Sequence, residues 1–398
     1  MHDYNKVFLR LYAFIKSNNF SGYDPYDFMA SPLARKRYLP QNRSLIILLT
    51  QLFRYSPVNF RKFLRIEKRQ NLKTLVLTAR SIINYFEAFG RSEELEKDLQ
   101  TVLTMILKHA QINNSFLSWG RIDYDYYSTT GLQKKESSLI YLTALAGYLF
   151  VEAYEYYRLD KYLAIAEKVG DFLSSIPAYE ENDSICFYYT TTLPNKIYNA
   201  SAHACAFLGL LYRYLPKEEY LLRAKKGFSY IEKVQNGNGS WNYGVSQEGK
   251  QLLLKDYHQG FILDSYYYYL KNLEGDKKSL ASYKKGLDFY ALRQFDPNGK
   301  SAFRYPRVWP ADIHNQAQGI ITFYLAGSIF PEFERVCEKI TQWTLSNMYG
   351  LTKGYFYYQK WPMFTNKIPY MRWNQAWMLY ALSHLIGTPK LQSNQESS

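Results

Sequence analysis

The sequence predicts an all-α fold, an (α/α)6 toroid of about six helical hairpins with aromatic-rich loops at one end. The main observation is a helical phrase that recurs about every 57 residues, a period typical of a repeated supersecondary unit. Its copies are apolar nearly all round, while the helices between them are amphipathic. An apolar helix needs neighbours on both sides and a cover outside, which favours a closed ring of hairpins over an open solenoid.

The elements follow in chain order. A short amphipathic N-terminal lead comes first, then a weaker inner-helix candidate near Ser81. The segment from Glu136 has the i, i+3, i+4, i+7 apolar spacing of a buried helix. Four clear inner copies begin at Tyr198, Asp256, Asp312 and Met371. Amphipathic outer helices are expected from Asp160, Glu218, Asp276 and Pro331.

Composition indicates one ordered domain rather than several. No Pro/Gly/Ser linker divides the 398 residues, of which 47% are apolar and 21% charged. We expect a single toroid domain over residues 1–387, N-terminal lead included, and a polar, disordered tail over 388–398. The three cysteines do not make an even set and lack CxxC spacing, which points away from a disulfide framework or zinc site. With neither signal peptide nor membrane-length apolar run, the expected location is the cytoplasm.

Net charge and aromatic content limit the classes of partner that the protein is expected to bind. A net charge of +14 attracts anions. No zinc-finger or RNA-binding signature is present, which disfavours nucleic acid. The 40 tyrosines suit stacking on sugar faces, although codon bias in an AT-rich genome explains them equally well. An acidic glycan or sugar precursor is the preferred partner, and a merely soluble basic protein is the alternative.

Two phrases carry a resemblance to a known family. YPRVWPADIHNQAQGIITF and KGYFYYQKWPMFTNKIPYMRWNQAWMLYAL resemble bacterial polysaccharide biosynthesis proteins of the VpsJ-like type, found in capsule and exopolysaccharide clusters. KDYHQGFILDS and SNNFSGYDPYD support the resemblance, which covers nearly the whole chain. It implies the six-hairpin glycosidase-like superfamily and a polysaccharide pathway, and carries over no catalytic residue.

Asp256 and Asp312 hold equivalent places in adjacent copies. Neighbouring helices pack about 8–10 Å apart, so the two carboxylates could stand at the ~6.5–9.5 Å separation of inverting glycosidases. Helix N-capping explains an Asp at either place somewhat better.

His258 and His314 each follow the Asp of their copy by two positions. Because side chains two apart on a helix do not share a face, we expect no Asp–His pair within one copy. Both histidines are candidates for proton transfer, and Tyr257 is a further candidate acid or base. Two histidines without a third ligand are weak evidence for a metal, so we expect no metal and no cofactor.

Candidate substrate-binding residues surround the same helix ends. Arg372 is the cation among the polar residues that open the copies, suited to a carboxylate or phosphate, and pairing with Asp256 or Asp312 is equally plausible. Asn199 opens the first clear copy. Aromatic side chains that could stack on sugar rings, or instead anchor loops in the core, are Trp373, Trp309, Trp241 and Tyr243.

Two upstream loops add acidic candidates. Asp123 and Asp125 lie in WGRIDYDYYSTTG, which the period places at the same end of the ring; Tyr124 lies between them. GYDPYD, with Asp24 and Asp27, is either a loop that closes over the ring or an N-terminal turn.

The leading interpretation is a carbohydrate-active protein of exopolysaccharide or capsule biosynthesis with one pocket at the loop end. This interpretation favours an enzyme, and it leaves open whether the enzyme is a hydrolase, a lyase or a C5-epimerase. The alternatives are a non-catalytic glycan-binding or scaffolding toroid, which would tolerate loss of both carboxylates, and an open protein-interaction solenoid. Other polysaccharide-assembly enzymes are possible partners.

Overall fold

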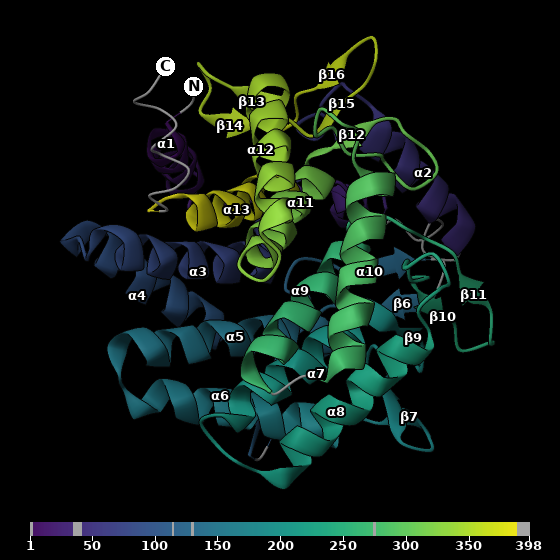
Figure 1. Ribbon diagram of the computed structural model, residues 1–398. Helices are drawn as coiled ribbons and strands as arrows, with labels where there is room; N and C mark the ends of the chain where they lie inside the picture. The colour runs from purple at the N-terminus through teal and green to yellow at the C-terminus, as the bar shows by residue number, and fades with distance from the viewer. Residues whose placement is uncertain (1–2, 35–41, 114, 129–130, 274–275, 388–398) are drawn as a thin grey trace.

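The computed structural model describes residues 3–34, 42–113, 115–128, 131–273 and 276–387. Within this part of the chain, six helices line the inside of a ring and six cover them outside (Figure 1). The inner helices are α3 (Leu72–Phe89), α5 (Ile140–Tyr157), α7 (Tyr198–Tyr212), α9 (His258–Asn272), α11 (Ile313–Gly327) and α13 (Trp377–Leu385), the last preceded by a π-helical turn, η3 (Met371–Ala376). The outer helices are α1 (Tyr4–Ser17), α4 (Glu93–Lys108), α6 (Asp160–Ser175), α8 (Glu218–Lys233), α10 (Lys277–Gln294) and α12 (Glu334–Met348).

Ring closure follows from the contacts of α13. Each inner helix packs on the next, and α13 packs on both α11 and α3, so first and last inner helices are neighbours. Asn84 on α3 donates to the Ser383 hydroxyl across this junction at 3.0 Å. The predicted N-terminal lead is part of the ring, because its helix α1 packs on α13 as the outer helix of the last hairpin. The predicted toroid is confirmed, and the predicted disordered tail at 388–398 lies outside the described residues.

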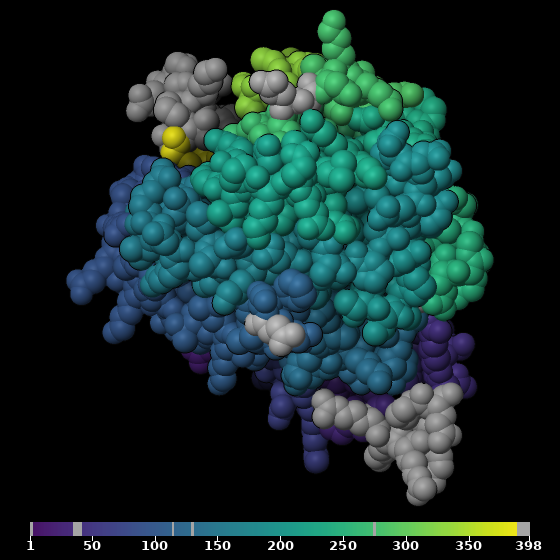
Figure 2. All heavy atoms as spheres, turned by 90° about the horizontal axis from the view of Figure 1, so that it is seen from below, coloured from purple at the N-terminus to yellow at the C-terminus, as the bar shows by residue number. Residues whose placement is uncertain are grey.

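Whether a helix lies inside or outside the ring follows from its pattern of apolar residues. Along α7 every residue from Tyr198 to Leu211 is buried, whereas the outer α8 buries one stripe of side chains. Close approach between the layers uses small residues: a Cβ on Gly227 of α8 would lie 2.1 Å from Cys205 Sγ on α7. Seen from below, the teal middle of the chain, including α6 and α8, forms a continuous surface, and purple N-terminal residues come into view at its lower edge (Figure 2).

Short antiparallel strands decorate the loops. Two sheets are three-stranded, β9 (Lys196–Ile197) with β10 (Gly244–Val245) and β11 (Gln251–Leu252), and β12 (Ala311–Asp312) with β15 (Gln359–Lys360) and β16 (Thr365–Asn366). The two-stranded pairs are β1 (Ser21–Gly22) with β2 (Arg69–Gln70), β3 (Gln111–Asn113) with β4 (Phe116–Ser118), β5 (Tyr126–Ser128) with β6 (Gly131–Gln133), β7 (Ala178–Glu181) with β8 (Ser184–Phe187), and β13 (Tyr349–Gly350) with β14 (Tyr355–Phe356). Strands β9 and β12 lead directly into inner helices α7 and α11, so these loops stand over the N-terminal ends of the ring.

An N-terminal excursion lies between α1 and α3. It contains a 3-10 turn, η1 (Asp27–Ala30), and α2 (Arg43–Tyr55), and has its own small apolar clusters. The outer helix α12 similarly begins with a 3-10 turn, η2 (Pro331–Phe333). Strand β1 seats the excursion on the ring: Met371 N donates to Tyr23 O at 3.0 Å, and a Cβ on Gly22 would meet Met371 Cβ at 2.4 Å. Only glycine fits this approach.

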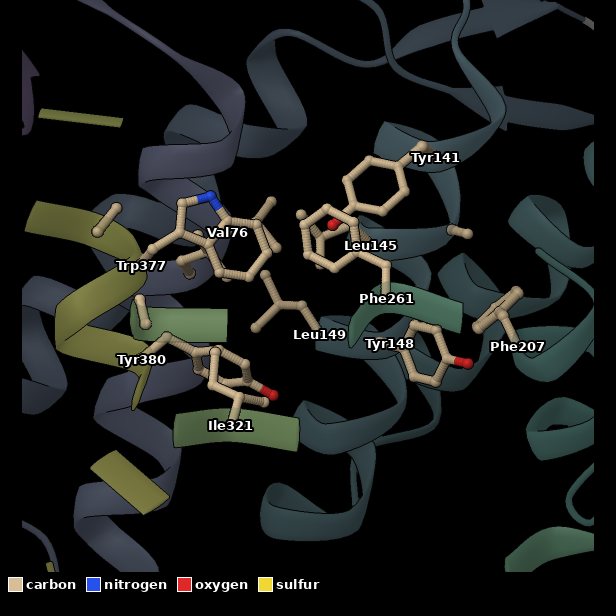
Figure 3. Close-up of a cluster of buried hydrophobic side chains, with 14 of the residues drawn as sticks. Val76, Tyr141, Leu145, Tyr148, Leu149, Phe207, Phe261, Ile321, Trp377 and Tyr380 are labelled. Atoms are coloured by element: carbon tan, nitrogen blue, oxygen red, sulfur yellow. The ribbon is translucent and has the colours of Figure 1, made fainter. Parts of the chain in front are cut away.

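Aromatic side chains fill the ring axis. Trp377 and Tyr380 of α13, Tyr141 of α5 and Phe261 of α9 converge there (Figure 3). The Phe261 ring centroid lies 5.3 Å from those of both Tyr141 and Trp377. Such rings bury large apolar areas, so the centre of the toroid is a packed core rather than an open channel.

Candidate functional site

The centre of the candidate site is an Asp–His pair at the start of α9. Asp256 Oδ1 lies 2.5 Å from His258 Nδ1 and 3.2 Å from the His258 backbone N, which donates to it. The expectation that Asp and His of one copy cannot meet is wrong for this copy. Asp256 precedes the helix, so the helical rule for residues two apart does not apply to it.

The environment of Asp256 keeps it ionised. Burial acts to raise its pKa, but the adjacent His258 ring and, more weakly, Arg304 hold the pKa below its usual value. Arg304 Nε lies 3.9 Å from Asp256 Oδ2. A buried carboxylate at Nδ1 fixes the tautomer and orientation of the imidazole. Among the described residues, none hydrogen-bonds to His258 Nε2, which leaves that nitrogen available.

His314, at the equivalent place on α11, makes no such pair. Its ring stacks on Tyr257 with centroids 4.1 Å apart and on Trp377 at 4.9 Å. Neither ring nitrogen has a hydrogen-bond partner within the described structure, although both are buried. Burial, together with nearby cations, lowers its pKa well below the usual value, so the imidazole is neutral. The Tyr257 ring also lies 4.1 Å from that of His258, so Tyr257 contacts both histidines.

Hydrogen bonds from neighbouring groups occupy both carboxylate oxygens of Asp312. Its Oδ1 accepts from the backbone N of His314 at 3.0 Å, the predicted N-cap, and from Trp373 Nε1 at 2.8 Å. Oδ2 accepts from Gln359 Nε2 at 2.8 Å. Burial raises its pKa even though Arg54 lies 4.0 Å away. With its oxygens bonded and the side chain enclosed, Asp312 is poorly placed to serve as the second carboxylate of an inverting pair.

Arg54 is a buried cation at the site that the sequence pattern does not reveal. It comes from α2, outside the repeating hairpins, and donates at 2.6 Å to the hydroxyls of both Tyr26 and Tyr358. Its guanidinium lies 5.2 Å from the centroid of the Trp373 ring. The excursion thus contributes directly to the loop end of the ring, as expected for GYDPYD if it closes over the ring.

Arg372 pairs with neither carboxylate suggested for it. Its Nε donates to Asp24 Oδ2 at 2.6 Å, and Asp24 Oδ1 accepts from Tyr124 at 2.7 Å. Burial acts to raise the pKa of Asp24, but Arg372 outweighs it and holds the pKa well below the usual value. Asp27 is held by Arg61 Nε at 2.9 Å, and burial nevertheless raises its pKa to about 6. Asp24 therefore fastens the excursion to the ring, whereas the Asp27–Arg61 pair holds the excursion itself together.

The upstream acids divide into one buried and one exposed. Asp123 lies 3.0 Å from Arg121 Nη2 and accepts from Asn71 at 2.7 Å. Asp125 is exposed and accepts the backbone N of Lys135 at 2.6 Å, at the β5–β6 hairpin. Their geometry favours structural roles over substrate contact.

The aromatic candidates for sugar stacking differ in their burial and in their distance from the Asp–His pair. Trp241 is 0% exposed and donates from Nε1 to the carbonyl of Ile231, so it anchors its loop and cannot stack on a sugar. Trp309 lies in a surface turn with Lys300 Nζ 3.9 Å from its ring centroid. Tyr243 meets the His258 ring edge-on at 4.6 Å and so lies directly beside the Asp–His pair.

Trp373 and Asn199 complete the predicted set. The Trp373 ring centroid lies 4.7 Å from that of His314, and its indole nitrogen is committed to Asp312. Asn199 is buried in the first turn of α7, and its Oδ1 has no partner within the described residues.

A second polar cluster lies deeper along the axis. A small pocket there is lined by side chains of all the inner helices, including Asp264, His203 and Arg80. Asp264 accepts from Gln318 Nε2 at 2.7 Å and Thr322 Oγ1 at 2.6 Å, and burial raises its pKa to about 7. The sequence did not single it out, because it stands two turns inside an apolar helix.

Two further findings concern the described residues only. No three His, Cys, Asp or Glu side chains gather there in a way that would hold a metal ion. None of the helices is both long enough and apolar enough to cross a membrane.

Solved structures share this architecture. Cellobiose 2-epimerase from Bacillus thermoamylovorans superposes with a TM-score of 0.65 at 12% identity, over 81% of this chain and 90% of that chain. A glycoside hydrolase family 76 α-mannanase from Bacteroides thetaiotaomicron gives a TM-score of 0.60 at 13% identity, over 81% and 86%. D-mannose isomerase gives 0.59 at 15% identity, over 78% and 86%.

No protein-family model and no curated protein sequence matches the chain. At these identities the likeness shows the fold alone, the (α/α)6 toroid that the repeat predicts.

Proposed function

We propose that this protein is a carbohydrate-active enzyme that transfers a proton at a sugar carbon, as an epimerase or isomerase does. The observation that carries the proposal is the Asp256–His258 pair, a buried carboxylate 2.5 Å from Nδ1 of a partly exposed imidazole. Such a pair is the usual construction of a general base that acts through Nε2.

In the proposed reaction, His258 Nε2 removes a proton from a carbon next to a carbonyl or carboxylate. The C–H electron pair forms a C=C bond, and the carbonyl electrons move onto the oxygen. In epimerisation a proton is returned to the opposite face of the same carbon and the carbonyl re-forms; in isomerisation a proton is added to the former carbonyl carbon, and the hydroxyl on the first carbon loses its proton to become the new carbonyl. Arg304 stands beside the pair and is the cation best placed to meet the developing negative charge. Tyr243 and Tyr257, which contact the His258 ring, are proposed to bind the sugar.

His314 has a proposed second role in proton transfer, since its imidazole is neutral and both nitrogens lack partners among the described residues. Its 1% exposure means that substrate would have to displace a neighbour to reach it. Asp312 and Arg372 are proposed to hold the site together, because their polar atoms are already engaged.

The similar solved structures support a sugar substrate, because their names describe an epimerase, an isomerase and a glycoside hydrolase. The resemblance to VpsJ-like proteins supports a cytoplasmic role in exopolysaccharide or capsule biosynthesis, beside other assembly enzymes. The net charge of +14 supports an acidic sugar or precursor. Glycoside hydrolysis is less favoured, because it needs a second free carboxylate.

Solvent exchange tests the proposal. The protein is incubated in D2O with a panel of aldoses, reducing disaccharides and uronates, and NMR follows replacement of C–H by C–D and formation of new isomers. We expect exchange at one carbon, and a loss of about 100-fold or more in His258→Gln. His109→Gln, a histidine outside the cluster, is the control and should keep full activity.

Other outcomes would reassign the protein. Release of new reducing ends without exchange would indicate a hydrolase, and an unsaturated product would indicate a lyase. Calorimetric binding of a glycan with no turnover, equal in wild type and Asp256→Asn, would favour the non-catalytic glycan-binding toroid.

A further inference from the structure

Helix α2 is apolar on two faces, which is unusual for a helix on the surface. One face packs inward through Ile46 and Phe53 and carries Arg54 to the candidate site. The opposite face exposes Leu48 and, at 62%, Leu52. A helix with only one buried side normally has polar residues on the other, so this outer face lacks a partner.

The exposed apolar surface continues beyond the helix. The loop that follows α2 exposes Val58 and Phe60, and its Phe63 side chain is 85% exposed. We call Leu48, Leu52, Val58, Phe60 and Phe63 the apolar edge. Single exposed apolar residues are normal on proteins, but five within 16 successive positions of one segment mark an interaction surface.

Two neighbouring loops extend the apolar edge. Asn366 Nδ2 donates to Ser56 O at 3.0 Å, which brings the β15–β16 turn beside the end of α2, as Figure 1 shows. The tip of that turn carries Met363, 92% exposed, and Phe364. On another side the Tyr55 ring contacts Phe303, whose backbone N donates to Val308 O, and Val308 is exposed as well.

The charge around this surface is almost wholly positive. Exposed Arg43, Lys62, Arg65 and Lys68 accompany the apolar edge, and the one acidic residue between Arg43 and Lys68 is Glu67. Neither Lys62 nor Arg65 pairs with a carboxylate among the described residues. The sequence around the β15–β16 turn is likewise basic, with no Asp or Glu from residue 339 to residue 395.

We propose that the apolar edge and its basic rim dock this protein onto an anionic lipid bilayer surface. Apolar side chains would enter the boundary between headgroups and acyl chains, while the lysines and arginines meet the phosphates. Charge complementarity selects the bilayer over a second copy of this chain, because two copies would bring the same positive rim face to face. A protein partner would need a matching acidic rim, and the net charge of +14 favours a broad anionic surface over a small one.

Docking in this way would orient the candidate site. Arg54, on the inner face of α2, reaches Tyr358 and lies 4.0 Å from Asp312, so the helix that would lie on the bilayer also contacts the loop end of the ring. The site would then stand close to the membrane surface, where a membrane-held precursor could enter. The proposal goes beyond the proton-transfer chemistry and does not depend on it.

Vesicle flotation of the full chain tests the proposal. We expect the protein to float with vesicles that contain phosphatidylglycerol at low salt, and to stay behind with phosphatidylcholine vesicles. Leu48→Ser/Leu52→Ser/Phe63→Ser should lower the bound fraction about tenfold or more. Lys62→Glu/Arg65→Glu should lower it about fivefold or more for each charge. The matched control is Leu292→Ser, at a 77% exposed leucine of outer helix α10, which should bind as wild type does.

Three results would overturn the proposal. The first is no flotation with anionic vesicles. The second is flotation that the triple serine variant retains in full, because binding would then reflect net charge alone. The third is a wild-type dimer, measured by light scattering, that the triple variant loses while neither binds vesicles. Circular dichroism confirms folding of each variant, and Phe63→Ser alone replaces the triple variant if that variant does not fold.

Discussion

The buried carboxyl of Asp264 should make the stability of the toroid depend on pH. In the folded chain its pKa is raised to about 7 by burial, against 3.8 as the ordinary value. Asp264→Asn mimics the protonated side chain and keeps an oxygen for Thr322. The buried Gln318 Oε1 has no partner among the described residues, so a turned Gln318 amide could accept from the amide group that this substitution introduces.

The sign and size of the effect follow from proton linkage. The folded state holds this proton more tightly than the unfolded chain, so the stability that Asp264 contributes is fully present below about pH 4 and is lost as the pH rises from 3.8 to about 7. A shift of about three pKa units corresponds to about 4 kcal/mol, of which the interval from about pH 5 to about pH 7 covers roughly 2–3 kcal/mol. Because asparagine does not titrate, Asp264→Asn should not lose this stability as the pH rises.

Urea denaturation of wild type and Asp264→Asn at about pH 5, 6 and 7 measures the effect as a difference between two curves. We expect the free energy of unfolding of the variant, relative to that of wild type, to rise by roughly 1 kcal/mol for each pH step. Asp288→Asn, at a partly exposed acid of α10 paired with Lys284, is the control and should track wild type within about 0.5 kcal/mol. Parallel curves for Asp264→Asn and wild type would show that Asp264 does not hold a proton in the folded state.

Two substitutions and one labelling experiment test the fold. Arg372→Met leaves Asp24 buried without its cation and should lower the free energy of unfolding by about 3–5 kcal/mol in urea; an unchanged midpoint would contradict the pairing. Gly227→Ala forces a methyl against Cys205 and should cost about 1–3 kcal/mol in thermal denaturation, while Gly237→Ala, where a Cβ meets nothing within 4 Å, should cost little. Burial raises the pKa of all three cysteine thiols, so a thiol reagent should label them only after unfolding, and fast labelling of the native protein would refute their enclosure.

Much of the ring could be predicted because its signals are local. The apolar copies at Tyr198, Asp256 and Asp312 and the amphipathic helices between them reflect what each helix must bury. Capping by Asp312 also follows from one residue and its neighbours. Such features depend on contacts close in sequence, so the pattern reveals them.

The candidate site was harder to predict, because side-chain direction at a helix start depends on backbone geometry. Asp256 and Asp312 occupy equivalent places, yet Asp256 holds His258 whereas Asp312 turns to Trp373 and Gln359. Residue spacing is the same in both copies and could not distinguish them. Arg54 was missed since its segment does not belong to the repeat.

An all-α ring of hairpins, with polar residues at the starts of its inner helices, follows from the sequence, because hydrophobic periodicity dictates which faces must be buried. The partners of those polar residues, in contrast, depend on tertiary contacts. Arg372 meets Asp24, 348 positions away in the chain, and α1 closes the hairpin that α13 begins. Partners this far apart leave no local pattern, since only the closed ring brings them within hydrogen-bond distance.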